Sequence, residues 1–418
     1  MRVTEIQTDY DLVVIGGGLV GASFACMAAQ TMAKAMSRES PRILVTEAIA
    51  SLQSSTSFDA RSTALSFGSQ QIYRGLGLWD ALAQNATPIA KIHVSDRGHF
   101  GAVRMDSEEL GVEALGQVVE NQHLGVVLTG ALEQAPAIDY LCPASITALT
   151  PAPQGMQVEV SMPDGSTSRV RAGLVVLADG GKSPLTAALG IASQVTRYEQ
   201  SAVIANVAFS DAHRGVAYER FTDTGPLAVL PLSPAQGEGR GALVWTVPTH
   251  DAEAMLAMSD DEFLAGLQQR FGYRLGTFTR VGSRAVYPLS LSTAAEQVRP
   301  GLVLLGNVAH TLHPVAGQGL NLALRDAEAL ARVLSEAMAA GQAPGAMAVL
   351  QQYVQSQQRD QSATIHFSHY MTRLFSSTHP ALVWARKFGL FSIDLIPPLK
   401  REFARQAMGL ADRMARRA

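Results

Sequence analysis

The chain has 418 residues, of which 17% are charged and 6% aromatic, and its formal net charge is −3. This length predicts two or three domains, because domains average about 150 residues. The weak charge excludes intrinsic disorder and a large basic field, so we expect no nucleic-acid partner. Two isolated cysteines, Cys26 and Cys142, exclude a disulfide scaffold and a structural zinc site and predict a reducing compartment.

The segment from Leu12 to Met32 is uncharged and long enough to span a bilayer. Three consecutive glycines, Gly16 to Gly18, argue against a spanning helix, because glycine is a poor helix former. The acidic residues Glu5, Asp9 and Asp11 are unlike the basic start of a signal peptide. We therefore expect a soluble, cytoplasmic protein.

The first chemistry-bearing segment begins with the apolar run 11–15, which is typical of a strand buried on both faces of a parallel sheet. Gly16, Gly18 and Gly21 then form a G-x-G-x-x-G pattern, followed by an alanine-rich helix to about Ser37. These glycines permit a tight turn, close approach of a pyrophosphate and close helix packing. The alternative is a turn that only packs a helix on a sheet.

A second buried strand is predicted from Arg42 to Glu47. It ends in an acid, and a dinucleotide site needs a carboxylate for ribose hydroxyls, so Glu47 is our candidate. The spacing from Gly21 exceeds the usual ~20 residues, and the long helix and a loop at 38–41 account for the excess.

Two further apolar runs lead into glycine-rich turns. Residues 174–177 precede Asp179 and Gly180, and residues 302–305 precede Gly306, Asn307 and a second glycine cluster at 314–321 that begins a long helix. Ligands of α/β sheets bind at the ends of such strands, and free N–H groups at a helix start suit an electron-rich ring. Taken singly, each pattern is equally consistent with simple turn glycines.

In this order and separation, the three segments resemble the flavoprotein aromatic hydroxylases, or group A flavin monooxygenases. The resemblance covers nearly the whole chain. It implies an α/β fold with a Rossmann-type FAD-binding domain and parallel sheet, an inserted, mostly antiparallel substrate-binding sheet, and C-terminal helices. The expected boundaries are 1–80, 111–190 and 285–345 for a discontinuous FAD-binding domain, 81–110 and 191–284 for the substrate-binding domain, and 346–418 for a C-terminal helical region.

The resemblance also assigns roles to single residues. Glu47 would hold the adenosine ribose, Arg61 within the segment 58–65 would face the flavin, and Asn121, before a helix from Leu124, would contact the ribityl chain. Asn307 stands where the family usually has Asp, and an amide oxygen can still accept a hydrogen bond from a hydroxyl. The implied FAD-binding residues are Gly16, Gly18, Gly21, Glu47, Arg61, Asn121, Asp179, Gly180, Gly306, Asn307, Ala316, Gly317, Gln318, Gly319 and Asn321, and the implied catalytic residues are His313, Pro314, Gly317 and Gln318.

Four stretches narrow the resemblance to the ubiquinone-biosynthesis branch, namely 92–99, 115–120, 202–207 and 219–232. This branch implies FAD, O₂ and NAD(P)H as co-substrate, with a flavin C4a-hydroperoxide that hydroxylates a polyprenylated methoxyphenol. Other ubiquinone-biosynthesis proteins are possible partners. A second strand-glycine-helix motif is missing from the sequence, so nicotinamide would visit the flavin transiently. Two rivals stay open: a flavin reductase or dehydrogenase, and a non-catalytic flavoprotein scaffold.

Between Tyr198 and Leu291 the pattern changes to alternating strands, such as 202–209 and 242–247, with a helix at 260–271. The strand at 242–247 is near the W-x-W-x-I-P pattern of flavin halogenases, but the first tryptophan is replaced by Leu243. A packing role for Trp245 is the better explanation.

His310 and His313 lie three residues apart with no neighbouring carboxylate pair, so we expect no metal site and place His313 beside the flavin. The stretch from Ala381 onward holds eight basic residues against three acidic ones, with apolar residues among them. It suits either peripheral contact with the inner membrane or a terminal helix packed on the body, broken at Pro397-Pro398.

Overall fold

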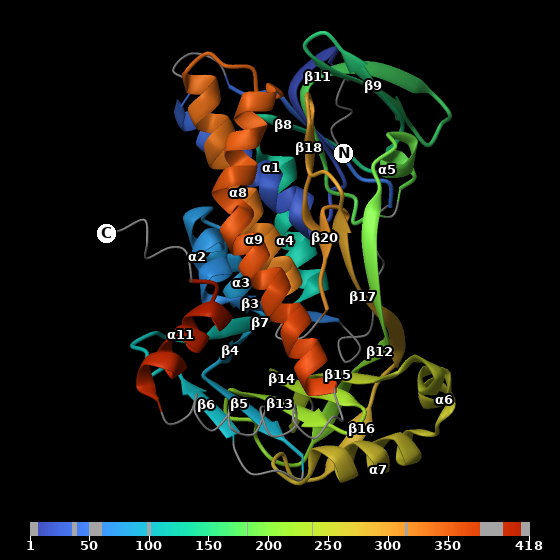
Figure 1. Cartoon of the computed structure of the whole chain (residues 1–418), viewed down its shortest axis with the longest axis vertical. Helices are drawn as coiled ribbons and strands as arrows, with labels where there is room; N and C mark the ends of the chain where they lie inside the picture. Colours follow the sequence, from blue (N-terminus) through green and yellow to red (C-terminus); the bar gives the residue numbers. More distant parts are fainter. Residues whose placement is uncertain are drawn as a thin grey trace.

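The structure is a computed structural model that describes residues 7–35, 40–49, 61–97, 102–181, 183–235, 237–313, 317–376 and 396–410. A mainly parallel sheet lies towards one end of the molecule and a long antiparallel sheet towards the other, and a bundle of helices runs along one side (Figure 1). The predicted fold class is confirmed.

The parallel sheet is built on β1 (Asp9–Ile15), which is buried on both faces. Leu12 and Val14 pack towards the helices, whereas Val13 and Ile15 pack into a second core on the opposite face. This double burial explains the continuous apolar run. The strands in spatial order are β18 (Val298–Arg299), β19 (Leu302–Leu304), β11 (Thr167–Leu177), β1, β2 (Ile43–Thr46) and β8 (Ile138–Leu141), and the hairpin of β9 (Ser145–Ala152) and β10 (Gly155–Ser161) extends from β11.

The uncharged segment from Leu12 to Met32 folds as β1, a glycine turn and helix α1 (Leu19–Ala35). This segment is therefore not one continuous helix. Within the described ranges, no helix has the length and apolar character needed to cross a membrane. Small residues of α1, including Ala25 and Ala28, are fully buried where α1 packs on α8. The helices on this side are α1, α2 (Phe67–Gly75), α3 (Trp79–Ala83), α4 (Asn121–Gln134), α8 (Gln318–Ala339) and α9 (Met347–Ser376).

The antiparallel sheet is centred on a long strand, β12 (Ser193–Phe209), which pairs with β15 and β17. One pairing at its far side, between β5 and β13, is parallel. The strands in spatial order are β20 (His310–Thr311), β17 (Ala285–Ala294), β12, β15 (Glu238–Pro248), β14 (Gly225–Ala235), β13 (Val216–Thr222), β5 (Lys91–Asp96) and β6 (Ala102–Asp106), and β16 (Phe278–Val281) pairs with β12.

The outer face of this sheet is covered by α6 (Ala252–Ala257) and α7 (Asp260–Phe271). A capping box of Ser259 and Glu262 starts α7, which satisfies N–H groups that the helix leaves free. Trp245 is buried against Phe263 of this helix, with ring centroids 5.4 Å apart. The packing explanation for Trp245 is therefore confirmed.

A small sheet of β3 (Ser62–Ser66), β7 (Gly116–Glu120) and β4 (Ala86–Ile89) connects the two large sheets. β7 leads directly into α4, which begins at Asn121 rather than near Leu124 as expected. The remaining short elements are α5 (Leu185–Ala188), the 3₁₀ turns η1 (Thr249–Asp251) and η2 (Gly306–Val308), and α11 (Pro397–Ala407).

The two prolines at 397–398 start α11, as suits their missing N–H groups. Ala404 and Met408 are buried in the same core as β5 and β6, and the Gly68 N–H donates to the Met408 carbonyl oxygen at 2.9 Å. For residues 396–410 this packing supports the interpretation of a helix packed on the body. The rest of the basic segment lies outside the described residues.

Candidate functional site

The glycine turn after β1 leaves open space at the start of α1. The Gly18 carbonyl accepts the helical hydrogen bond of the Ala22 N–H at 2.9 Å, and a Cβ added at Gly18 would meet no heavy atom within 4 Å. A Cβ added at Gly21 would overlap the Gly16 carbonyl oxygen. Gly21 is therefore required for packing, whereas Gly18 leaves the free N–H groups of the helix start accessible to an anion.

Gly16 brings the end of β11 against this turn. Its φ of +100° favours glycine, and an added Cβ would lie 2.8 Å from the Asp179 Cα. The Asp179 carboxylate accepts hydrogen bonds from the Gly181 N–H at 2.9 Å and from the Ser183 N–H at 3.1 Å, and it also contacts the Ser183 hydroxyl. Asp179 thus fixes the turn of Gly180 and Gly181 beside the first glycine motif.

Glu47 lies at the end of β2, on the other side of β1. A Cβ added at Gly17 would lie 3.0 Å from the Glu47 Cβ and 3.0 Å from the Tyr140 ring. One Glu47 carboxylate oxygen accepts from the Ile49 N–H at 2.9 Å. Burial raises the pKa of the Tyr140 hydroxyl, so this neighbour stays neutral. The predicted ribose carboxylate therefore lies directly beside the predicted pyrophosphate turn.

The third predicted segment, 302–307, ends at the same edge of the parallel sheet as β1, β2 and β11. The Leu305 N–H donates to the Leu177 carbonyl oxygen at 2.9 Å, and a Cβ added at Gly306 would lie 3.2 Å from Val20 at the start of α1. Asn307 is exposed, and its carbonyl accepts from the Thr311 hydroxyl at 3.0 Å. The ends of β2, β1, β11 and β19 thus form one edge, as expected for a ligand site of an α/β sheet.

Arg61 and Asn121 also lie together. The Asn121 N–H donates to the Arg61 carbonyl oxygen at 2.8 Å, and the Thr63 hydroxyl donates to the Asn121 side-chain oxygen at 2.6 Å. The exposed Arg61 guanidinium lies over the ring of Tyr287 on β17, 5.2 Å from its centroid. This cation–π contact holds the arginine between the small sheet and the antiparallel sheet.

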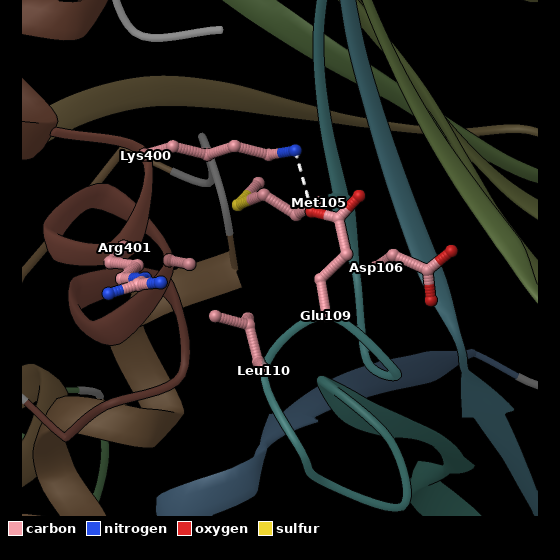
Figure 2. Close-up of a pocket in the computed structure, with 7 residues that line it drawn as sticks. Met105, Asp106, Glu109, Leu110, Lys400 and Arg401 are labelled. Carbon is pink, nitrogen blue, oxygen red and sulfur yellow. Dashed lines mark hydrogen bonds and ion pairs between the residues drawn. The ribbon is translucent and has the colours of Figure 1, made fainter. Parts of the chain in front are cut away.

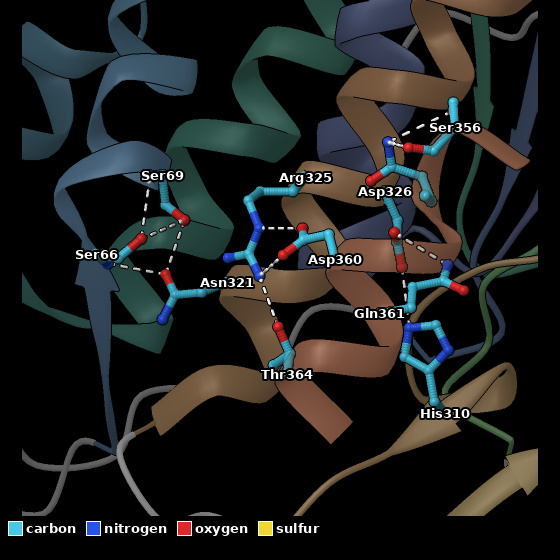
Figure 3. A network of polar contacts seen from close by, with 11 residues as sticks. Ser66, Ser69, His310, Asn321, Arg325, Asp326, Ser356, Asp360, Gln361 and Thr364 are labelled. Atoms are coloured by element: carbon cyan, nitrogen blue, oxygen red, sulfur yellow. Dashed lines mark hydrogen bonds and ion pairs between the residues drawn. The ribbon is translucent and has the colours of Figure 1, made fainter. Parts of the chain in front are cut away.

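The start of α8 is tied to β3 through Asn321 (Figure 3). The Asn321 oxygen accepts from the Ser66 N–H at 2.8 Å and the Ser69 hydroxyl at 2.7 Å, while its amide nitrogen donates to the Ala64 and Gly317 carbonyl oxygens at 2.9 and 2.7 Å. With both ends of its amide engaged in the protein, Asn321 positions the loop.

Gly317 precedes α8 with a φ of +59°, a left-handed conformation that favours glycine. Gln318 is buried, and a Cβ added at Gly319 would meet nothing within 4 Å. Pro314 and Ala316, which were predicted to line the flavin, lie outside the described residues.

A buried polar network lies behind this loop (Figure 3). His310 Nε2 lies 2.9 Å from an Asp326 carboxylate oxygen, and the Gln361 amide donates to the other oxygen at 3.1 Å. Next to it, Arg325 forms an ion pair with Asp360 at 2.6 Å, which links α8 to α9. Nowhere in the described part of the chain do three His, Cys, Asp or Glu side chains gather as metal ligands would.

His313 is almost fully buried at 1% exposure, and its ring meets that of Tyr198 edge to face at 5.4 Å. Burial lowers the pKa of His313 to about 4, so its imidazole is neutral near pH 7. The Tyr198 hydroxyl lies 2.9 Å from His369 Nδ1 on α9, and the Ser368 hydroxyl donates to the His313 carbonyl oxygen at 3.4 Å. These contacts hold the end of the loop against α9.

A separate hollow of about 340 Å³ lies between β6 and α11 (Figure 2). Its walls include Met105, Asp106 and Leu110 from the β6 side, and the Lys400 ammonium bridges it to Glu109 at 2.7 Å. None of the predicted site residues that the structure describes lines it. This hollow therefore belongs to the contact between α11 and the antiparallel sheet. It is separate from the edge formed by the ends of β2, β1, β11 and β19.

Several site contacts were not found by sequence reasoning. Tyr287 gave no signal, because a tyrosine in an alternating strand is ordinary. Asn321 and its partners on β3 lie far apart in the sequence. His310 and Asp326 lie on different elements, so no single segment of the sequence indicated their contact. A signal for Asp326 was its place on a buried face of α8, since a buried acid needs a partner.

Comparison with known proteins agrees with this geometry. The family model described as FAD binding domain matches residues 9–368. The chain is 35% identical to ubiquinone hydroxylase UbiL of Rhodospirillum rubrum, over 96% of the chain and 89% of that protein. It is 31% identical to 3-demethoxyubiquinol 3-hydroxylase of Escherichia coli, over 96% and 98%, and 30% identical to human ubiquinone biosynthesis monooxygenase COQ6, over 95% and 92%.

Among solved structures, p-nitrophenol 4-monooxygenase PnpA of Pseudomonas putida has the same fold, with a TM-score of 0.77 and 20% identity over 97% of this chain and 99% of that one. The matched family covers all three glycine segments, and their open backbone and positive φ angles suit the cofactor. The resemblance to the flavoprotein aromatic hydroxylases is thus confirmed, and the chain belongs to the FAD-binding monooxygenase family.

Proposed function

We propose that the protein hydroxylates the ring of a polyprenylated methoxyphenol in ubiquinone biosynthesis, with FAD as cofactor and NAD(P)H and O₂ as co-substrates. The observation that carries this proposal is the full-length similarity to three enzymes whose names place them in ubiquinone hydroxylation. Within that branch, the stretches at 92–99, 115–120, 202–207 and 219–232 are most like those of 2-octaprenyl-6-methoxyphenol hydroxylase.

The residues at the sheet edge would each contact a different part of FAD. The α1 start with Gly16, Gly18 and Gly21 would take the pyrophosphate, since it offers free N–H groups and the positive end of the helix dipole. Glu47 would accept from the ribose hydroxyls. Asp179 would act indirectly, because its carboxylate is already bonded to its own turn.

The remaining predicted residues would surround the flavin. Arg61 would face the flavin, and the ribityl region would be contacted by Asn121, Gly306 and Asn307. Gly317, Gln318 and Gly319 would direct N–H groups at the ring, and Asn321 would hold that loop through its four hydrogen bonds. Bound FAD supplies the transfer of electrons from NAD(P)H to oxygen.

The protein itself contributes orientation and exclusion of water. Neutral His313, packed against Tyr198, adds no charge to the loop beside the flavin. Pro314 is the further residue that we propose for this surface. The inner face of the antiparallel sheet is the face turned away from α7. Its apolar side chains would hold the prenyl phenol against the loop beside the flavin.

We propose the domain division that the sequence predicts, with 1–80, 111–190 and 285–345 for FAD, 81–110 and 191–284 for substrate, and 346–418 as a C-terminal region. β17 pairs with β12, so this strand is shared with the substrate-binding sheet. Peripheral contact of the C-terminal segment with the inner membrane, and association with other ubiquinone-biosynthesis proteins, stay predictions.

The test is turnover with purified holoprotein, NAD(P)H and a short-chain 2-prenyl-6-methoxyphenol, with product mass as the readout. We expect an added mass of one oxygen atom only when both oxygen and reduced nicotinamide are present. Equal nicotinamide oxidation under anaerobic conditions with a quinone acceptor would instead support the reductase alternative. Flavin binding without any turnover would support the scaffold alternative.

A further inference from the structure

Glu219 lies on the inner face of the antiparallel sheet, which is the face turned away from α7. Side chains alternate along β13, and Tyr218 points to the outer face, where its ring lies 5.5 Å from that of Phe271. Ala217 and Phe221 are buried in the core on the opposite face. Glu219, which lies between them with the same parity, therefore shares the inner face.

The neighbours of Glu219 in register with it and along β13 are apolar. Val94 on β5 and Ala228 on β14 lie in register with it on either side, and Ala217 and Phe221 flank it along the strand. Burial alone raises the pKa of the Glu219 carboxyl to about 7, with no contribution from a charged or hydrogen-bonding neighbour among the described residues. A carboxyl without a partner in such a place is costly for folding.

Glu219 is nevertheless only half-buried. A partly accessible carboxyl group without a protein partner is open to a hydrogen-bond donor from a ligand. Ala64 packs against the core that contains Ala217 and Phe221, and a Cβ added at Gly317 would lie 3.6 Å from the Ala64 Cβ. The inner face around Glu219 is thus continuous with residues beside the Gly317 loop.

Helix α9 gives a second link between this face and the loop. α9 contacts β14, the strand next to β13, and its Ser368 hydroxyl donates to the His313 carbonyl oxygen. Figure 1 shows the lower part of α9 reaching down to β14 and β15. Helix α9 therefore joins the sheet that carries Glu219 to His313, at the described end of the loop before α8.

We propose that Glu219 determines substrate specificity: its carboxyl group accepts a hydrogen bond from the ring hydroxyl of the phenolic substrate and so fixes which edge of the ring faces the flavin. This inference rests on the proposed function, since it assigns the substrate partner of that same site. A phenol brings one O–H donor into an apolar cavity, and a carboxyl oxygen is a strong acceptor for it. The apolar neighbours of Glu219 suit the prenyl chain.

The test compares Glu219→Leu, Glu219→Gln and the control Glu253→Leu, which makes the same change at an exposed position of α6. Each holoprotein receives the short-chain 2-prenyl-6-methoxyphenol or its O-methylated counterpart, which lacks the donor. FAD content and substrate-free NAD(P)H oxidation verify that the flavin site is intact. Glu219→Gln, which keeps an acceptor oxygen, provides a folded comparison if the leucine variant is unstable.

We expect Glu219→Leu to lower kcat/KM for the phenol by about ten- to a hundredfold, the effect of leaving the buried substrate hydroxyl without its acceptor, while the control stays at the wild-type value. With the O-methylated compound, wild type and Glu219→Leu should be equal. If wild type hydroxylates the phenol and both Glu219 variants match it, the Glu219 inference is wrong and the proposed function stands. If wild type itself makes no product, the proposed function fails and takes this inference with it.

Discussion

Replacing single glycines in the first turn by alanine separates folding from FAD binding. In Gly18→Ala the new methyl group enters open space, so the free energy of unfolding of the apoprotein should fall by less than about 1 kcal/mol, the scale of an N-cap change. In Gly21→Ala the methyl overlaps the Gly16 carbonyl oxygen and lies 3.1 Å from its carbon. Because backbone cannot yield as a side chain does, we expect a loss of about 3 kcal/mol, the upper range for overpacking.

FAD binding should show the opposite order. Gly18→Ala, which barely changes stability, should be the substitution that weakens FAD binding directly. The Gly18 methyl occupies space that a pyrophosphate needs, so Gly18→Ala should weaken FAD by about ten- to a hundredfold through loss of charged hydrogen bonds. Urea unfolding of the apoproteins and titration of flavin fluorescence measure the two effects independently. Equal destabilisation by both substitutions, or wild-type FAD affinity in Gly18→Ala, would refute the assignment of this turn.

Two other substitutions test the loop before α8. Asn321→Ala should lower the free energy of unfolding, measured in urea, by about 3 kcal/mol, because four hydrogen-bonding groups lose their partner. The control Asn307→Ala, at an exposed position, should change it by less than about 0.5 kcal/mol. Equal effects would contradict the anchoring role of Asn321. His313→Asn tests the pH dependence of stability. Burial lowers the folded-state pKa of His313 to about 4, so the neutral ring stabilises the fold above the unfolded pKa of about 6.5. This contribution is lost as the pH falls from about 6.5 to about 4. The wild-type advantage in urea should therefore decrease by roughly 3 kcal/mol between pH 7 and pH 4, and a difference that is constant with pH would contradict the cause given.

The elements with the strongest local patterns could be predicted from sequence. The run 12–15 is apolar at every position because β1 is covered on both faces, and Gly21 is required by a contact within its own turn. Such features depend on residues close in sequence, so composition and spacing carry them. The inserted sheet was also predicted, because its strands alternate in polarity.

Contacts between distant segments could not be predicted in the same way. The structure engages the Asn321 amide with Gly317 and with Ala64, Ser66 and Ser69, which lie some 250 residues away in the sequence. The predicted contact of Asn321 with the cofactor stays a prediction. The small sheet of β3, β7 and β4 was not recognised, since each strand is short and their pairing depends on tertiary packing. Glu219 itself carried no distinctive sequence pattern, and only the register of β13 shows that it lies between Val94 and Ala228.

The most direct measurement of the central proposal is turnover under ¹⁸O₂, with labelled product, hydrogen peroxide and oxidised nicotinamide counted together. The proposal predicts one labelled oxygen atom in the ring of each product molecule and one NAD(P)H oxidised for it, with little hydrogen peroxide. If every electron from NAD(P)H appears in hydrogen peroxide, or passes to a quinone at the same rate without oxygen, the protein is not a hydroxylase of this substrate.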